Sequence, residues 1–133
     1  NKLALGHHFD DVIETTMLNL LCAGNFKTML PKLNSTNFDG IQIIRPLYYI
    51  REEHIVRFIQ NSGIWPLNCA CMVAAKKTGN KRYEIKDFIK SLGENFKDVE
   101  KSIFKAAENV NIDSVLGWQQ DGVKHSFLEK NKK

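Results

Sequence analysis

The side chains best suited to chemistry lie near the start of the chain, directly after a short apolar run. The run Lys2–Leu5 predicts a buried strand that stops at Gly6, and a helical pattern begins at Asp10. Ligands bind at the carboxyl ends of strands in open α/β sheets, and the free N–H groups of a helix start favour phosphate. The ligand-type residues of this segment are Gly6, His7, His8, Asp10, Asp11, Glu14 and Thr15.

Two adjacent aspartates would repel a bare phosphate. They fit a site in which one caps the helix and the other meets Mg²⁺ or a ligand hydroxyl. Asp11 and Thr15 lie one turn apart on one helix face, as do Asp10 and Glu14. The pattern favours a functional site. The alternative that the residues leave open has Asp10 as the helix cap, Glu14 as a surface acid and the histidines as ordinary loop residues.

A second candidate site is the pair Cys69 and Cys71. Thiolates bind soft metals and iron–sulfur clusters, and they are also nucleophiles. Two cysteines cannot complete a tetrahedral site, so further ligands would come from elsewhere; the alternative is a pair of buried, inert cysteines. Three cysteines with this spacing are not a disulfide framework and indicate a reducing cytoplasm. Cys22 lies on an apolar helical pattern and is predicted to belong to the core.

Basic side chains offer a third kind of site. Arg45 follows a predicted strand and precedes a proline, so it could reach a phosphate, with a surface salt bridge as an equal alternative. Arg82, Lys86 and Lys90 recur at four-residue spacing and therefore share one helix face. Residues 51–92 hold the whole net charge of +4, with eight basic against four acidic side chains. RNA or a phosphate ligand could bind there, although charge alone favours a solvated lysine-rich surface.

Hydrophobic periodicity predicts the elements that must position these residues. The expected elements are strands over residues 2–5 and 41–44 and helices over about residues 10–22, 51–62, 81–92 and 96–110. We expect the first helix to be buried almost all round. The other helices are expected to bury the stripes Ile55, Phe58 and Ile59; Ile85, Phe88, Ile89 and Leu92; and Val99, Ile103, Ala106, Ala107 and Val110.

Size and composition limit the architecture. A chain of 133 residues that is 43% hydrophobic is one compact domain or part of one. No apolar run could span a bilayer, so we expect no membrane partner. The chain starts inside a domain pattern without Met, which predicts a piece of a longer protein. Two strands make a poor sheet, so we expect strands from outside the chain, or a second copy in a homodimer, to complete it.

The segment Leu5–Thr15 resembles the Gly-His-His-x-Asp-Asp-x-x-Glu-Thr motif of PP-loop ATPases that modify tRNA. Met29–Leu33, and Arg45-Pro46-Leu47 followed by Arg51-Glu52, resemble the tRNA 2-thiocytidine synthetase branch, and the likeness covers roughly residues 3–92. It implies an α/β fold: the C-terminal part of a parallel-sheet adenine-nucleotide α-hydrolase-like (PP-loop) domain with a mostly helical C-terminal extension. The implied parts are residues 1–63 for the PP-loop domain, 64–80 for a cysteine loop and 81–133 for the helical extension.

The resemblance implies an enzyme that adenylates a cytidine base oxygen of tRNA with ATP and Mg²⁺, after which sulfur from a donor displaces AMP. Asp11 would be its chemical centre. The residues implied to bind nucleotide or Mg²⁺ are Gly6, His7, His8, Asp10, Asp11, Glu14, Thr15 and Arg45. A [4Fe–4S] cluster would take Cys69 by position, with Cys71 left open. The implied RNA contacts are Arg82, Lys86 and Lys90.

The family's Ser-Gly-Gly-x-Asp-Ser phosphate loop and upstream Cys-x-x-Cys pair do not occur in this sequence. We therefore expect the isolated chain neither to turn over ATP nor to hold a cluster stably. Another PP-loop ligase, such as tRNA-isoleucine lysidine synthetase, is an alternative whose chemistry needs no thiol. A non-enzymatic metal- or RNA-binding module would use the cysteines and the basic face. A His/Asp metal hydrolase would need a second His-Asp set, which the sequence lacks.

Overall fold

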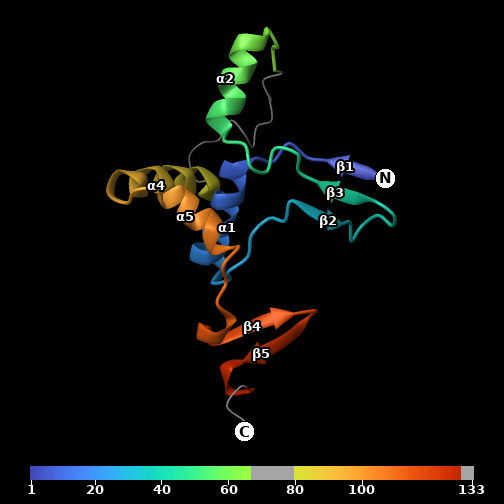
Figure 1. Ribbon diagram of the computed structural model, residues 1–133, viewed down its shortest axis with the longest axis vertical. Helices are drawn as coiled ribbons and strands as arrows, with labels where there is room; N and C mark the ends of the chain where they lie inside the picture. Colours follow the sequence, from blue (N-terminus) through green and yellow to red (C-terminus); the bar gives the residue numbers. More distant parts are fainter. Residues whose placement is uncertain (67–79, 130–133) are drawn as a thin grey trace.

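The computed structural model describes residues 1–66 and 80–129. Its α/β class agrees with the expectation from the sequence. The elements, in chain order, are β1 (Lys2–Ala4), α1 (Phe9–Ala23), β2 (Lys32–Asn34), β3 (Gln42–Ile44), α2 (Glu52–Ser62), α4 (Lys81–Asn95), α5 (Val99–Ala106), β4 (Gly117–Gln120) and β5 (Val123–Ser126). Figure 1 shows an elongated molecule with α2 at one end, the β4–β5 hairpin at the other, and α1, α4 and α5 between them.

The strands β1, β3 and β2 form one sheet in that order. β1 runs parallel to β3, with Lys2 opposite Gln42, whereas β2 runs antiparallel, with Leu33 opposite Ile43. The sheet is therefore mixed, and the turn-rich composition around β2 had not predicted that strand. The expectation of a buried first strand is wrong: Leu3 is 47% exposed, because the sheet extends away from the helices (Figure 1).

Helix α1 begins and ends where its sequence predicts. The backbone N–H of His8 donates to the Asp11 carboxylate at 2.9 Å, and Gly24 ends the helix with φ of 58°. The expectation that α1 is buried almost all round is wrong for its last turn, where Leu21 is 54% exposed and Cys22 is also exposed. The core covers only the first half of the helix, so Cys22 is not a core residue.

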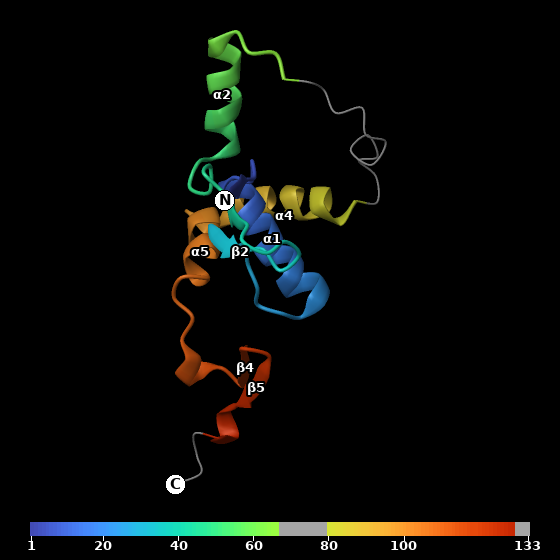
Figure 2. The same ribbon diagram turned by 90° about the vertical axis from the view of Figure 1, so that its right-hand side faces the viewer.

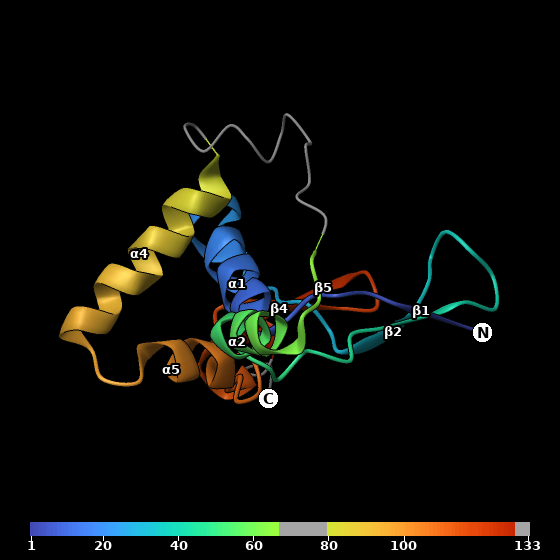
Figure 3. The ribbon, with the colours of Figure 1, turned by 90° about the horizontal axis from the view of Figure 1, so that it is seen from above.

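The core forms where α4 and α5 pack against α1 (Figure 3). Phe9 and Phe104 stack with ring centroids 4.7 Å apart. Ile85 and Ile89 are buried as predicted, but Phe88 on the same predicted stripe is 43% exposed. The buried hydrophobic residues are Phe9, Val12, Ile13, Met17, Tyr48, Ile85, Ile89 and Phe104.

The last predicted helix is shorter than its pattern suggested and turns a different residue inward. It spans Val99–Ala106 instead of residues 96–110, so Val110 lies beyond its end and is 47% exposed. Phe104, which the predicted stripe omitted, is the buried residue of this helix. Its ring reaches the core because it stacks on the first residue of α1.

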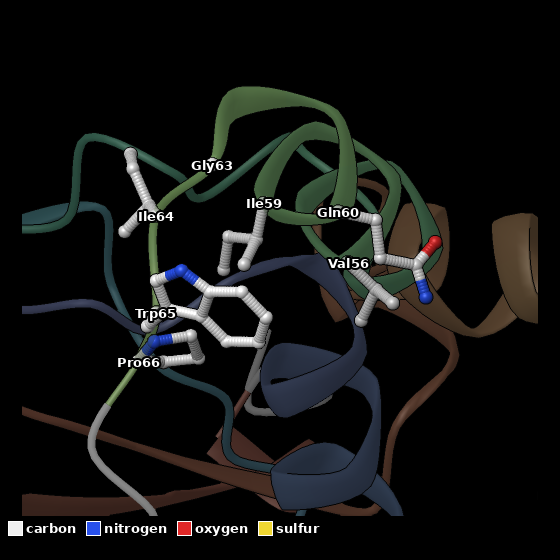
Figure 4. Close-up of a pocket in the computed structure, with 7 residues that line it drawn as sticks. All are labelled: Val56, Ile59, Gln60, Gly63, Ile64, Trp65 and Pro66. Carbon is white, nitrogen blue, oxygen red and sulfur yellow. The ribbon is translucent and has the colours of Figure 1, made fainter.

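Helix α2 projects away from the body in both views (Figures 1 and 2). None of its residues is buried, and Phe58 is 65% exposed, so the predicted buried stripe on this helix is wrong. Gly63 ends the helix with φ of 67°, as the sequence predicted. The chain then turns back along α2 and leaves an apolar groove of about 460 Å³, beside which Trp65 is 92% exposed (Figure 4).

The C-terminal part is not entirely helical, because β4 and β5 pair as an antiparallel hairpin. Asp121 and Gly122 form its turn with φ of 50° and 79°, a pairing of residue types that favours two-residue hairpins. The rings of Trp118 and His125 stack across the two strands at 5.0 Å. None of the described helices is long and apolar enough to cross a membrane.

Candidate functional site

Two carboxylates of α1 meet one guanidinium of α4. Arg82 places Nη2 2.6 Å from Asp11 Oδ1 and Nε 2.9 Å from Glu14 Oε2. The side chain of Glu14 is 8% exposed and that of Asp11 20%, whereas 41% of the Arg82 side chain stays exposed. The two acids are three positions apart and therefore neighbours on the helix surface. One planar fork of donors thus fixes both acids.

Glu14 depends on this contact for the stability of its charged form. Burial raises the pKa of Glu14, and the hydrogen bond and charge of Arg82 oppose that rise. A buried carboxylate without a partner would be costly. The contact with Arg82 therefore helps to stabilise the buried Glu14 carboxylate in α1.

The imidazole of His8 lies between two acids at the start of α1. Its Nε2 is 3.4 Å from Asp11 Oδ2, and its Nδ1 is 3.6 Å from Asp10 Oδ2. Within the part of the chain that the structure describes, Nδ1 is buried and lacks a hydrogen-bond partner. The backbone of His8 also donates to Asp11, so both its main chain and its ring face the acid pair.

Asp10 accepts a hydrogen bond from the start of helix α2, not of its own helix α1. Its Oδ2 accepts the backbone N–H of Glu52, the first residue of α2, at 2.7 Å. A carboxylate at that place satisfies a free donor and faces the positive end of the helix dipole. The alternative in which Asp10 caps its own helix is wrong, because His8 occupies the cap position and Asp11 accepts its N–H.

Lys86 extends the charged network to the same end of α2. Its ammonium pairs with the Glu52 carboxylate. Partial burial lowers the pKa of Lys86, but the hydrogen bond and charge of Glu52 and the charges of Glu14 and Asp10 together outweigh burial, so the pKa is raised overall. A cleft of about 260 Å³ opens beside it. Its charged lining residues are Asp10, Glu14, Lys86, Asp87, Lys90 and Glu100.

Arg45 and His7 contact each other and do not belong to the acid cluster of α1, which consists of Asp10, Asp11 and Glu14. Arg45 Nε lies 3.4 Å from His7 Nδ1, and its guanidinium also donates to the carbonyl of Leu30. These bonds tie the loop after β1 to the segment before β2. Arg45 and His7, both predicted to bind nucleotide, thus lie side by side, and the groups they contact here belong to the protein itself.

The other predicted residues are more scattered. Thr15 offers its backbone carbonyl to the Asn19 side chain. Gly6 has open space where a side chain would begin. Cys69 and Cys71, with most of the predicted cysteine loop, lie outside the described residues.

The acids of the cluster already have protein partners. Both oxygens of Asp11 are used, one by Arg82 and one by His8, and an oxygen of Asp10 is used by Glu52. Over residues 1–66 and 80–129, no group of three or more His, Cys, Asp or Glu side chains is arranged to hold a metal ion. These residues alone therefore do not fit a Mg²⁺ site.

Sequence reasoning missed the contacts that join distant segments. Arg82 was predicted to contact RNA, and nothing in its spacing pointed to Asp11, 71 positions away. The pair between Arg51, before α2, and Glu100, in α5, was missed for the same reason. Only the packing of α4 and α5 on α1 brings these residues together.

Residues 1–66 match the family model of the PP-loop domain. This part of the chain belongs to the PP-loop family. The resemblance drawn from Leu5–Thr15 is confirmed, since that segment lies within the match. The PP-loop match includes α1 and α2 but ends before α4, so the acids of the cluster lie inside it and Arg82 lies beyond it.

Curated relatives extend the similarity past the PP-loop match. The tRNA-cytidine(32) 2-sulfurtransferase of Geotalea uraniireducens is 40% identical over 111 residues, which are 83% of this chain and 43% of that protein. The protein of the same name from Pelobacter propionicus is 38% identical over 92% of this chain and 45% of its own length. That from Vibrio vulnificus is 36% identical over 82% and 34%. The PP-loop chain thus spans less than half the length of each.

Proposed function

We propose that this PP-loop chain is part of an enzyme that thiolates a cytidine of tRNA at the expense of ATP. The observation that carries the proposal is the cluster of His8, Asp10 and Asp11 at the start of α1, directly after β1, within the PP-loop match. The relatives described above share the name 2-sulfurtransferase, which favours thiolation over lysidine synthesis.

The proposed reaction has two steps. The carbonyl oxygen of the base attacks the α-phosphorus of ATP, forming an O–P bond and releasing pyrophosphate. A sulfur nucleophile then bonds to the ring carbon that carries this oxygen, the C–O bond breaks, and AMP leaves with the oxygen. Adenylation is needed because a carbonyl oxygen is a poor leaving group. The sulfur comes from a donor outside this chain.

The proposed nucleotide site follows the start of α1. Asp11 is its proposed centre, and its fixed orientation between Arg82 and the backbone of His8 supports that role. ATP and Mg²⁺ are the proposed cofactors, and partners for the ion would come from groups other than the described carboxylates. The residues proposed to line this site are Gly6, His7, His8, Asp10, Asp11, Glu14, Thr15 and Arg45.

The thiol chemistry is proposed for the cysteines. A [4Fe–4S] cluster in the complete enzyme would use Cys69, and the choice between Cys69 and Cys71 is an outcome of mutagenesis. Such thiolates call for a reducing compartment, so we propose a cytoplasmic enzyme. We also propose that a second copy or further strands complete the sheet, since β1 and β2 are its edges.

Nucleoside analysis of tRNA tests this function. The complete enzyme is expressed in a bacterial strain that lacks its own tRNA-cytidine 2-sulfurtransferase, and tRNA digests are analysed by mass spectrometry. The expected result is the appearance of 2-thiocytidine with the wild-type protein and a much smaller, still measurable amount with Asp11→Asn. Soluble wild-type protein without any 2-thiocytidine would overturn the proposal, and lysidine in its place would select the other ligase.

A further inference from the structure

We propose that Arg82 is a positioning residue for the reaction proposed above: it acts from outside the PP-loop match, through Asp11, to orient and neutralise the acid cluster of α1. The proposal rests on the proposed function and adds to it a residue of α4. Its basis is the two-carboxylate contact, with 2.6 Å to Asp11 and 2.9 Å to Glu14.

The guanidinium suits this task because of its shape. It presents several donors in one rigid plane, so a single side chain reaches two carboxylates that belong to one helix face. An ammonium is a point charge, and a lysine here would contact one acid well and the other poorly. The position therefore requires arginine for geometry as well as for charge.

Charge balance gives a second reason. Asp10, Asp11 and Glu14 place three acids in the first two turns of α1, next to the proposed nucleotide. Like charges at this spacing repel one another and would repel a triphosphate. Arg82 offsets part of this charge, and it also holds the Asp11 carboxylate in one orientation. Removing the guanidinium should therefore lower turnover in two ways, because the acids would repel the nucleotide more strongly and the Asp11 carboxylate would lose its fixed orientation.

The same contacts argue against a main role for Arg82 in binding RNA. Its Nε and one Nη already donate to carboxylates of the protein. Lys90, one of the other predicted RNA contacts on α4, is exposed at the cleft beside Lys86 and has no ion-pair partner among the described residues. Lys90 is thus the better phosphate contact of the two.

Steady-state kinetics and tRNA binding separate the two roles in the complete enzyme. The variants are Arg82→Gln, Arg82→Lys and Lys90→Gln, with Lys81→Gln as the matched control, because Lys81 is an exposed neighbour whose ion pair among the described residues, with Glu84, lies within α4. We expect Arg82→Gln to lower kcat by between about 10-fold and 100-fold, with the Kd for tRNA changed by less than about twofold. Arg82→Lys should recover part of kcat, and Lys90→Gln should weaken tRNA binding more than Arg82→Gln does.

A double variant tests whether Arg82 acts through Asp11. If it does, Asp11→Asn combined with Arg82→Gln is no slower than Asp11→Asn alone, since residues that act as a unit are not additive. Multiplied losses would overturn the proposal, as would wild-type kcat in Arg82→Gln or a weakened Kd for tRNA with kcat retained. If Arg82→Gln does not fold, Arg82→Lys carries the same comparison.

Failure of the proposed function is a separate outcome. A wild-type enzyme that forms no 2-thiocytidine overturns the proposed function and the role of Arg82 together. An active wild-type enzyme with an equally active Arg82→Gln variant overturns the positioning role alone. Thermal melting of each variant identifies losses of activity that come from unfolding.

Discussion

The carboxylate of Asp10 accepts the backbone N–H of Glu52 at 2.7 Å, so a residue of α1 caps the first turn of α2. The two residues are 42 positions apart. Lys86 joins them from α4 through the side chain of Glu52. The helix that projects farthest from the body is therefore anchored at its first turn by the acid cluster.

Asp10→Ala should loosen that anchor. Loss of a cap costs about 1 kcal/mol of stability in typical cases, and the exposed α2 has little packing to offset it. We expect a fall of this size in the free energy of unfolding by urea, with faster amide exchange in α2. Glu94→Ala, which removes an exposed acid near the end of α4, is the control and should change stability by less than about 0.5 kcal/mol. Equal losses in the two variants would contradict the cap.

Phe104→Ala should be far more damaging. The ring is 8% exposed and stacks on Phe9 in the core, so its removal leaves a cavity between α5 and α1. Phe→Ala changes in cores cost about 3–5 kcal/mol. Phe58→Ala on α2 deletes the same group where it is 65% exposed, and we expect a much smaller loss. Denaturant midpoints measure both, and similar shifts would show that α5 does not pack as described.

Glu14→Gln should change the pH dependence of stability. Burial raises the pKa of Glu14 above its ordinary value of 4.5, so the folded state binds its proton more tightly than the unfolded state does. The stability that this protonated acid contributes is present below pH 4.5 and is lost as pH rises through the folded pKa. The free energy of unfolding of the variant, relative to wild type, should therefore increase with pH above 4.5. If the free energy of unfolding of the variant, relative to wild type, falls over the same pH range, the pKa of Glu14 is not raised in the folded state.

Two glycine-to-alanine changes should have opposite effects. A Cβ on Gly93, inside α4, meets nothing within 4 Å, and alanine stabilises a helix interior by about 0.5–1 kcal/mol over glycine. A Cβ on Gly117 would lie 2.7 Å from the backbone oxygen of His125, across the hairpin. Gly117→Ala should thus raise amide exchange in β4 and β5, while Gly93→Ala raises the melting temperature. Protected hairpin amides in Gly117→Ala would contradict the close approach.

Local signals in the sequence predicted local structure. The start of α1 after a polar turn, and the ends of α1 and α2 at Gly24 and Gly63, follow from caps and backbone preferences of a few residues. The motif around Asp11 likewise lies within one short segment. Each of these depends only on neighbours along the chain.

Long-range packing could not be predicted in the same way. The apolar stripe of α2 shows that one face of the helix is suited to packing against another apolar surface. Periodicity does not show whether that surface belongs to this chain, and Phe58 on the stripe is exposed. Cys22 follows a helical pattern beyond the point where α4 and α5 cover α1. The role of Arg82 depends on that same packing, because its partners are more than 65 positions away.

The two sheets also differ in the order in which they can assemble. β4 and β5 are joined by a two-residue turn, so their contacts are local, and hairpins of this kind form in about 1–10 μs. β1 must find β3 across forty positions, because Lys2 pairs with Gln42, and closing such a loop costs more entropy and time. The N-terminal sheet, which leads into the acid cluster, is therefore expected to form after the hairpin.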